Sequence, residues 1–166
     1  RHKNYLSDVH GKRPCAVFVS QTEALAQAAA DFVRRMRSAE RLELRDIVIL
    51  TVSTLVKSVL GSLTELAGIP VSHKPEEGKL WLTTVRRYKG LEAKAILLVD
   101  VHVSKLVKPT CQRLVYVGSS RASAYLETIF LSDVSAEEYP ALVERLDTDM
   151  EPSPQGVAKW LGMEAQ

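Results

Sequence analysis

The sequence predicts one α/β domain built on a mainly parallel β-sheet with helices on both faces. Apolar runs of 4–6 residues alternate with amphipathic helical patterns along the 166 residues, and uninterrupted apolar runs are typical of strands buried on both faces. Hydrophobic residues make up 46% and charged residues 25% of the chain, which excludes a disordered or collagen-like protein. No apolar run reaches the ~18 residues that a membrane span requires.

The first half of the chain predicts two strand–helix pairs and a short strand. In order, these are a strand at 16–19, a helix from Ser20 or Thr22 to about Ala39, a strand at 46–50, a helix at 53–67 and a strand at 69–72. Pro14 precedes the first strand, and Gly68 is a normal C-cap for the second helix. Apolar residues at helical spacing give the first helix one buried face.

The second half continues the alternation after a turn at Pro75–Gly78. The expected elements are strands at 79–85, 95–100 and 126–131, helices at about 110–122, 136–146 and 155–163, and a polar loop or single helical turn at 86–92. The composition divides the chain into a domain at 1–148 and a linker with a short helix at 149–166. Ligands of such sheets bind outside the carboxyl ends of the strands.

Charge is distributed unevenly behind a formal total of +2. Residues 81–121 carry a net charge of +6, whereas residues 122–166 carry −7. A basic middle with an acidic tail is a common arrangement in a protein that meets a polyanion on one face.

Several kinds of site are excluded by the motifs that the sequence lacks. It contains no GxxxxGK[ST], GxGxxG, HExxH or GxSxG. Its two cysteines are far apart and its four histidines are scattered, so no metal site and no disulfide framework is expected. No apolar signal segment follows Arg1–Tyr5, and we therefore expect a cytoplasmic protein.

Two segments stand out, Trp81–Asp100 and Leu114–Ala122. The first contains Lys-Gly-Leu-Glu between two apolar strands, and the second reads Tyr-Val-Gly-Ser-Ser-Arg-Ala. Together they resemble motifs V and VI of the UvrD/Rep-like superfamily I DNA helicases, and Asp46–Val71 resembles the neighbourhood of motif IV. The resemblance covers residues 14–131 and implies the second, C-terminal RecA-like domain of that family, which has no P-loop of its own.

The resemblance implies two groups of site residues. Arg121 is placed as the arginine finger on the γ-phosphate of ATP, Glu92 as a ribose acceptor and Gly90 as the sharp turn beside the nucleotide. A planar, permanently charged guanidinium suits a phosphate. The resemblance also implies that four further residues contact single-stranded DNA: Thr84, Arg86, Arg87 and Lys89. Mg²⁺ would be held by an N-terminal P-loop domain of the same full-length chain, which this sequence lacks.

The sequence departs from the family pattern in four places. No arginine follows the 46–50 strand, where Lys57 is the nearest cation, although the family places a second γ-phosphate ligand there. Arg86 stands where motif V usually has His, and Gly118 where motif VI usually has Ala. Ser72–Lys79 spans the position of an inserted accessory domain, which places the chain in a compact branch and favours ATP-dependent translocation over duplex unwinding.

The expected function is therefore the C-terminal motor domain of an ATP-dependent DNA helicase or translocase, inactive as an isolated fragment. The alternative is a degenerate RecA-like adaptor that binds protein or nucleic acid without hydrolysing ATP. A third, weaker hypothesis is a stand-alone domain that binds a small nucleotide. The site residues also have structural interpretations: the basic loop as a solvated surface, Arg121 as a helix cap or an ion-pair partner, and Glu92 as a local ion-pair partner.

Overall fold

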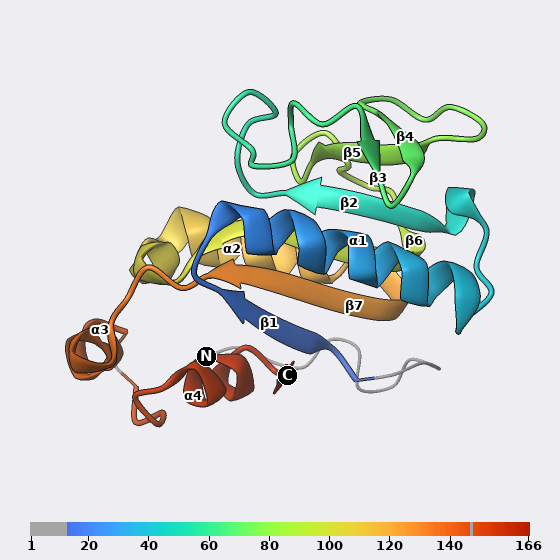
Figure 1. Ribbon diagram of the computed structural model, residues 1–166. Coiled ribbons are helices and arrows are strands. Elements are labelled where there is room, and N and C mark those ends of the chain that lie inside the picture. The colour runs from blue at the N-terminus through green and yellow to red at the C-terminus, as the bar shows by residue number, and fades with distance from the viewer. Residues whose placement is uncertain (1–12, 147) are drawn as a thin grey trace.

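A computed structural model describes residues 13–146 and 148–166, in which a mainly parallel sheet forms the centre of the protein (Figure 1). The eight strands lie in the order β3-β4-β5-β2-β6-β7-β1-β8, and all neighbouring pairs are parallel except the β3–β4 pair. The strands are β1 (Cys15–Val19), β2 (Ile47–Thr51), β3 (Glu65–Leu66), β4 (Ile69–Ser72), β5 (Leu80–Thr84), β6 (Ala93–His102), β7 (Ala122–Leu131) and β8 (Glu164–Ala165). The predicted α/β, RecA-like fold class is confirmed.

Helices cover both faces of this sheet, with α1 in front and α2 behind in Figure 1. The α-helices are α1 (Thr22–Ser38), α2 (Pro109–Ser119), α3 (Tyr139–Arg145) and α4 (Pro154–Trp160), and short 3₁₀ helices occupy Leu44–Asp46, Val103–Val107 and Ala136–Glu138. Alternate side chains of β2 pack into different cores, Ile49 on the α1 side and Leu50 on the α2 side. Burial on both faces explains why the strands read as continuous apolar runs.

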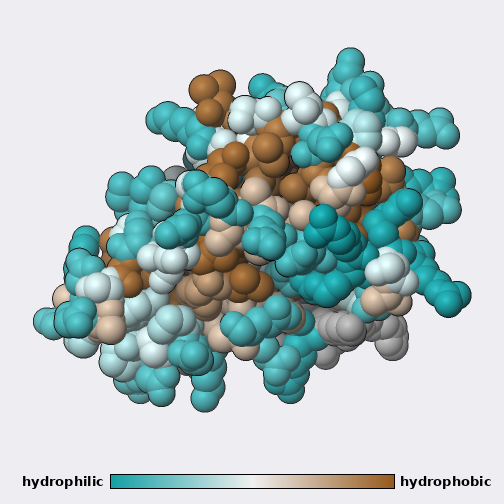
Figure 2. All heavy atoms as spheres, in the orientation of Figure 1, coloured by the Kyte–Doolittle hydropathy of each residue, from teal (hydrophilic) through white to brown (hydrophobic). Residues whose placement is uncertain are grey.

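The surface is largely hydrophilic on the face shown in Figure 2, while hydrophobic atoms gather in its upper part.

No helix in the described part of the chain combines the length and apolar character needed to cross a bilayer. Arg1–Tyr5, from which the cytoplasmic location was expected, lies outside the described residues.

The helix expected at 53–67 is wrong. Between β2 and β3 the chain forms a series of turns instead. The buried carboxylate of Asp100 accepts hydrogen bonds from the Ser58 hydroxyl at 2.6 Å and the Val59 amide at 3.0 Å. In addition, β-branched residues such as Thr54 and Val56 favour helices weakly. These tertiary contacts outweigh the amphipathic pattern.

Gly68 belongs to a β-hairpin turn rather than to a helix C-cap. Ala67 and Gly68 have φ of 53° and 74°, and they connect the paired residues Leu66 and Ile69. Two consecutive positive φ angles match the right-handed twist of a tight hairpin. A glycine therefore ends the segment, as the sequence predicted, but in a different element.

The remaining elements agree with the prediction apart from their bounds. The expected helix at 136–146 is divided into a 3₁₀ turn and α3, and β6 and β7 are both longer than predicted. The two-residue strand β8 was not predicted; the Glu164 amide donates to the Pro14 carbonyl at 2.8 Å beside β1. Val157 of α4 lies in the same core as α2, so residues after 149 pack on the sheet.

The connection from β5 to β6 is short for a parallel crossover. Residues 85–92 pass from the carboxyl end of β5 to the amino end of β6 in a series of turns. Val85 and Tyr88 are 2% exposed and pack in the core beneath α2. The crossover therefore runs between two opposite edges of the sheet, which we name the carboxyl edge and the amino edge after the strand ends found there.

Candidate functional site

The predicted site residues divide between the two edges. Thr84 ends β5, and Arg86 and Arg87 follow it at the carboxyl edge. Gly90 and Glu92 precede β6 at the amino edge, and Arg121 precedes β7 at the same edge. Lys89 is exposed and lines neither of the cavities described below. Thr84, Arg86 and Arg87 thus lie apart from the residues implied for nucleotide, whereas Lys89, also implied for nucleic acid, directly precedes Gly90.

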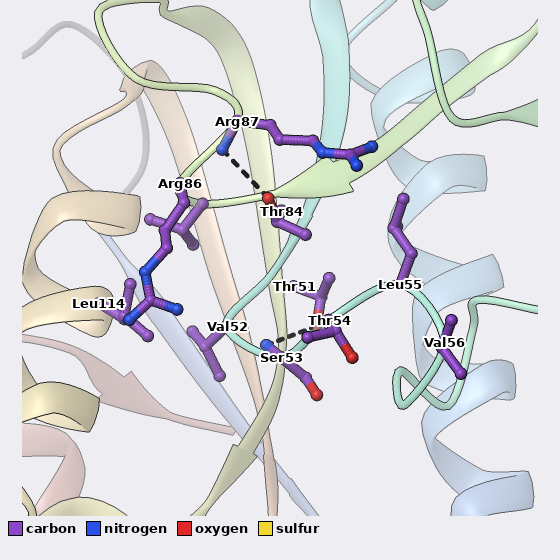
Figure 3. A pocket seen from close by; sticks show the side chains of 11 residues that line it. Thr51, Val52, Ser53, Thr54, Leu55, Val56, Thr84, Arg86, Arg87 and Leu114 are labelled. Carbon is purple, nitrogen blue, oxygen red and sulfur yellow. Dashed lines mark hydrogen bonds between the residues drawn. The ribbon is translucent and has the colours of Figure 1, made fainter.

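A cavity of about 370 Å³ opens at the carboxyl edge, between the ends of β2 and β5 (Figure 3). Its walls come from residues 51–56, residues 84–87 and Leu114 of α2. In Figure 3, Arg86 extends toward Leu114 and Arg87 extends the other way, toward Leu55. Both arginines are exposed, and neither forms an ion pair within the described residues, so both guanidinium groups are available to an anion.

Local hydrogen bonds fix the backbone of this cavity. The Arg87 amide donates to Thr84 Oγ1 at 3.1 Å, and the Ser53 amide donates to Thr51 Oγ1 at 2.9 Å. Thr51 in turn donates to Asp100 Oδ2 at 2.5 Å. The hydroxyl groups at both strand ends therefore shape the turns that carry the cavity walls.

Asp100, on the neighbouring strand β6, holds the cavity wall formed by residues 51–56 in place. It is 6% exposed, its φ is 68°, and the β6–β7 register shifts between Leu98 and Val101. An aspartate tolerates this left-handed conformation better than most residues. The sequence predicted only a core strand here, and its role as the anchor of residues 51–59 comes from the structure.

The amino edge brings Arg121 beside the Lys-Gly-Leu-Glu turn. The Ala93 amide donates to the Arg121 carbonyl oxygen at 3.0 Å, so Arg121 and the exposed Glu92 adjoin across one strand pair. Gly90 has a φ of 81°, and a Cβ atom there would meet nothing within 4 Å. Glycine is therefore favoured at this position by its conformation and not by crowding.

Among the described residues, Arg121 has no ion-pair partner that would account for its charge. Within residues 13–146 and 148–166, its guanidinium forms no ion pair, and its Nε is buried without a hydrogen-bond partner. Arg35 shows the contrast, since its Nη2 donates to both carboxylate oxygens of Glu127, at 2.9 and 3.0 Å. Buried polar groups are normally satisfied, and the unpaired Nε of Arg121 is a donor that a water or a ligand can occupy.

A second, larger cavity of about 990 Å³ adjoins Glu92 at the amino edge. Trp81, Tyr88 and Leu91 line it together with the starts of β2 and β5. The rings of Trp81 and Tyr88 meet edge to face, with centroids 5.2 Å apart. Burial and the negative charge of Glu92 raise the pKa of Tyr88, while Arg121 opposes the shift; the phenol is thus neutral at physiological pH.

Gly118 explains one departure from the family pattern. A Cβ atom at this position would lie 2.8 Å from Leu98 Cδ1 and 3.2 Å from Val85 Cγ2. Both neighbours belong to the core beneath α2, where extra volume is costly. The glycine allows α2 to lie close to β6 and the 85–92 crossover.

Sequence reasoning missed three contributions to the site: the 52–56 wall, Tyr88 and the anchor Asp100. The first had a usable signal, because residues that follow a buried parallel strand lie where ligands bind. Tyr88 and Asp100 carried no such signal. Each lies in a segment where a buried residue is expected for packing alone, so the sequence does not distinguish a site residue from a core residue.

Among the described residues, no cluster of three or more His, Cys, Asp or Glu side chains could hold a metal ion.

Comparison with solved structures finds a similar fold in the C-terminal domain of a possible DNA helicase from Lactobacillus plantarum WCFS1. The TM-score is 0.60, the sequence identity is 20%, and the match covers 84% of this chain and 88% of that one. At this identity the similarity concerns the fold. No protein-family model and no curated protein matches the sequence.

Proposed function

We propose that this chain is the second RecA-like domain of a UvrD/Rep-like, ATP-dependent DNA helicase or translocase. It would complete an ATP site at its amino edge and carry part of a single-stranded DNA track at its carboxyl edge. The similar fold of a possible helicase domain supports this proposal, as do the motif residues on each edge.

The position of Arg121 carries the proposal. Its guanidinium lacks an ion-pair partner among the described residues, and it adjoins Glu92 across the β6–β7 pair. The carboxylate of Glu92 can accept a hydroxyl hydrogen bond, while Arg121 can neutralise charge on a phosphate. ATP and its Mg²⁺ would be held largely by the P-loop domain, because this sequence lacks a P-loop.

Substitution of Arg121 tests the proposal in the complete natural polypeptide. We expect Arg121→Ala to lower the DNA-stimulated ATPase rate by ~10³–10⁵, the range measured for arginine fingers. Arg113→Ala is the matched control, because Arg113 is an exposed cation on the same segment and should leave the rate unchanged. The 166-residue chain alone should show negligible ATPase activity, and robust hydrolysis by it would contradict the proposal.

The adaptor hypothesis is favoured by one observation. β2 ends at Thr51, and residues 52–54 follow it without an arginine. The nearby Lys57 is exposed, so the second phosphate ligand that the family resemblance implies is missing. An ATPase rate that Arg121→Ala leaves unchanged would support this hypothesis instead.

A further inference from the structure

We propose that the single-stranded DNA track continues from the carboxyl-edge cavity across the start of α2 to two lysines, Lys105 and Lys108, beyond the carboxyl end of β6. This inference rests on the proposed function, since it extends the nucleic-acid surface that begins at Arg86 and Arg87. Both lysines lie between the two motif segments and outside the residues that the family resemblance implies for a site.

The first argument is the charge that the motif residues leave unexplained. Residues 81–121 carry a net charge of +6, and Lys105 and Lys108 contribute to it from outside both motifs. Both side chains are exposed, and neither forms an ion pair within the described residues. Unpaired cations on one surface raise the local potential, which attracts a polyanion.

The second argument is the geometry that connects the lysines to α2. The Lys108 amide donates to the Lys105 carbonyl oxygen at 3.0 Å, so one turn directly before α2 carries both side chains. Burial raises the pKa of the Cys111 thiol, and the nearby charges of the two lysines oppose that shift. Cys111 lies one helical turn before Leu114 on the same face, a face that Arg113 does not share. Leu114 lines the carboxyl-edge cavity, so the lysines adjoin the same row of α2.

The third argument is the position of the arginines at the other end of this row. Arg86 extends toward Leu114 in Figure 3, and no carboxylate lines the cavity in the described part of the chain. β2 separates β5 from β6 in the sheet, so the carboxyl ends of β5 and β6 are about 10 Å apart. A strand whose phosphates contact Arg87 and Arg86 would therefore reach the lysines after crossing the first turns of α2.

Acidic residues beyond the end of β7 limit the track on the other side of the lysines. Asp133 accepts hydrogen bonds from the Ser104 amide at 2.9 Å and from the Ser104 hydroxyl at 2.5 Å. Glu137 and Glu138 follow it and are exposed. Because carboxylates repel phosphates, the basic path runs from β5 past β2 to β6 and ends before β7.

Lys105→Ala combined with Lys108→Ala tests the proposal in the complete natural polypeptide. Fluorescence anisotropy with a labelled single-stranded oligonucleotide should give a slope of log affinity against log salt that is shallower by about 1.4, because two phosphate contacts are lost. Both side chains are exposed, so we expect the melting temperature to be unchanged. The matched control is Lys94→Ala with Lys159→Ala. It removes two exposed lysines, at the start of β6 and on α4, that line neither cavity, and it should leave the slope unchanged.

The variant with Arg86→Ala and Arg87→Ala separates this proposal from the proposed function. If the lysine variant keeps the full slope while the arginine variant does not, the extended track is overturned and the arginine contacts stand. An equal loss of slope in the Lys94 and Lys159 control would also overturn it, since total charge would then explain the effect. If the arginine variant keeps the full slope too, the single-stranded DNA track of the proposed function itself fails.

Discussion

Arg35 and Glu127 form a residue pair whose contribution to stability depends on pH. Glu127 is 2% exposed; burial raises the pKa of its carboxyl group, and the hydrogen bonds from Arg35 partly oppose that shift. A raised folded-state pKa means that the contribution of Glu127 is most favourable below its unfolded pKa. That contribution is lost as the pH rises through the folded-state pKa.

We therefore expect Arg35→Met to destabilise the protein more at pH 7 than at about pH 4. At pH 7 the variant leaves a buried carboxylate without its cation, at a cost of about 1–3 kcal/mol. We place the cost in this range because the Arg35 side chain is 44% exposed and therefore screened by solvent. Urea unfolding at both pH values measures the difference; an equal loss at both would show that the ion pair is not responsible.

The individual site residues also differ in whether the sequence alone predicts them. Arg121, Gly90 and Glu92 were predicted because their motif spacing is specific, and the structure places all three at one edge. The places of Asp100 and Tyr88 were not predicted, since burial and tertiary hydrogen bonds are properties of the folded chain. A single sequence carries no signal for a hydrogen bond between residues 41 positions apart, such as Val59 and Asp100.

At the scale of elements, the segment between β2 and β3 depends on Asp100 for its shape. Asp100→Gly preserves the φ of 68° without strain but removes the acceptor for Thr51, Ser58 and Val59. We expect the free energy of unfolding to fall by about 2–4 kcal/mol, and the Val59 amide to exchange its hydrogen much faster.

Asp100→Asn provides the matched comparison. Asparagine keeps a carbonyl acceptor and tolerates the left-handed conformation, so it should lose less stability and retain part of the Val59 protection. Hydrogen exchange followed by mass spectrometry measures both variants. Equal losses in the two would argue that the hydrogen bonds of Asp100 do not hold this segment.

Elements were predictable where local pattern and tertiary packing agree. The α1 periodicity and the apolar run of β6 gave the right element types because each buries a full face. The 53–67 segment has an amphipathic pattern too, but its apolar side chains, among them Leu55 and Leu60, pack from turns instead. Its conformation depends on a buried carboxylate contributed by another strand.

For the whole molecule, the separation of the two edges predicts that nucleic-acid and nucleotide binding can be disrupted independently. We expect Arg86→Ala with Arg87→Ala to weaken single-stranded DNA binding while leaving ATP affinity in the absence of DNA unchanged. Arg121→Ala should do the reverse. Fluorescence anisotropy with a labelled oligonucleotide and calorimetry with ATP measure the two affinities.

Salt dependence identifies the type of contact that is lost. Each phosphate contact to single-stranded nucleic acid contributes about −0.7 to the slope of log affinity against log salt. The double arginine variant should therefore show a slope shallower by about 1.4, whereas Arg113→Ala, with its exposed cation outside the carboxyl-edge cavity, should leave the slope unchanged. An unaltered slope in the double variant would place the DNA contacts elsewhere.

The outermost strands have a consequence for the behaviour of the protein at high concentration. Within the described residues, the sheet ends in β3 on one side and β8 on the other, each two residues long. An incoming chain that pairs with such a strand gains few backbone hydrogen bonds, and very short edge strands are a known defence against edge-to-edge aggregation. Residues 164–166 thus cover β1, and a variant that loses the β8 pairing would expose the backbone of a five-residue strand to self-association.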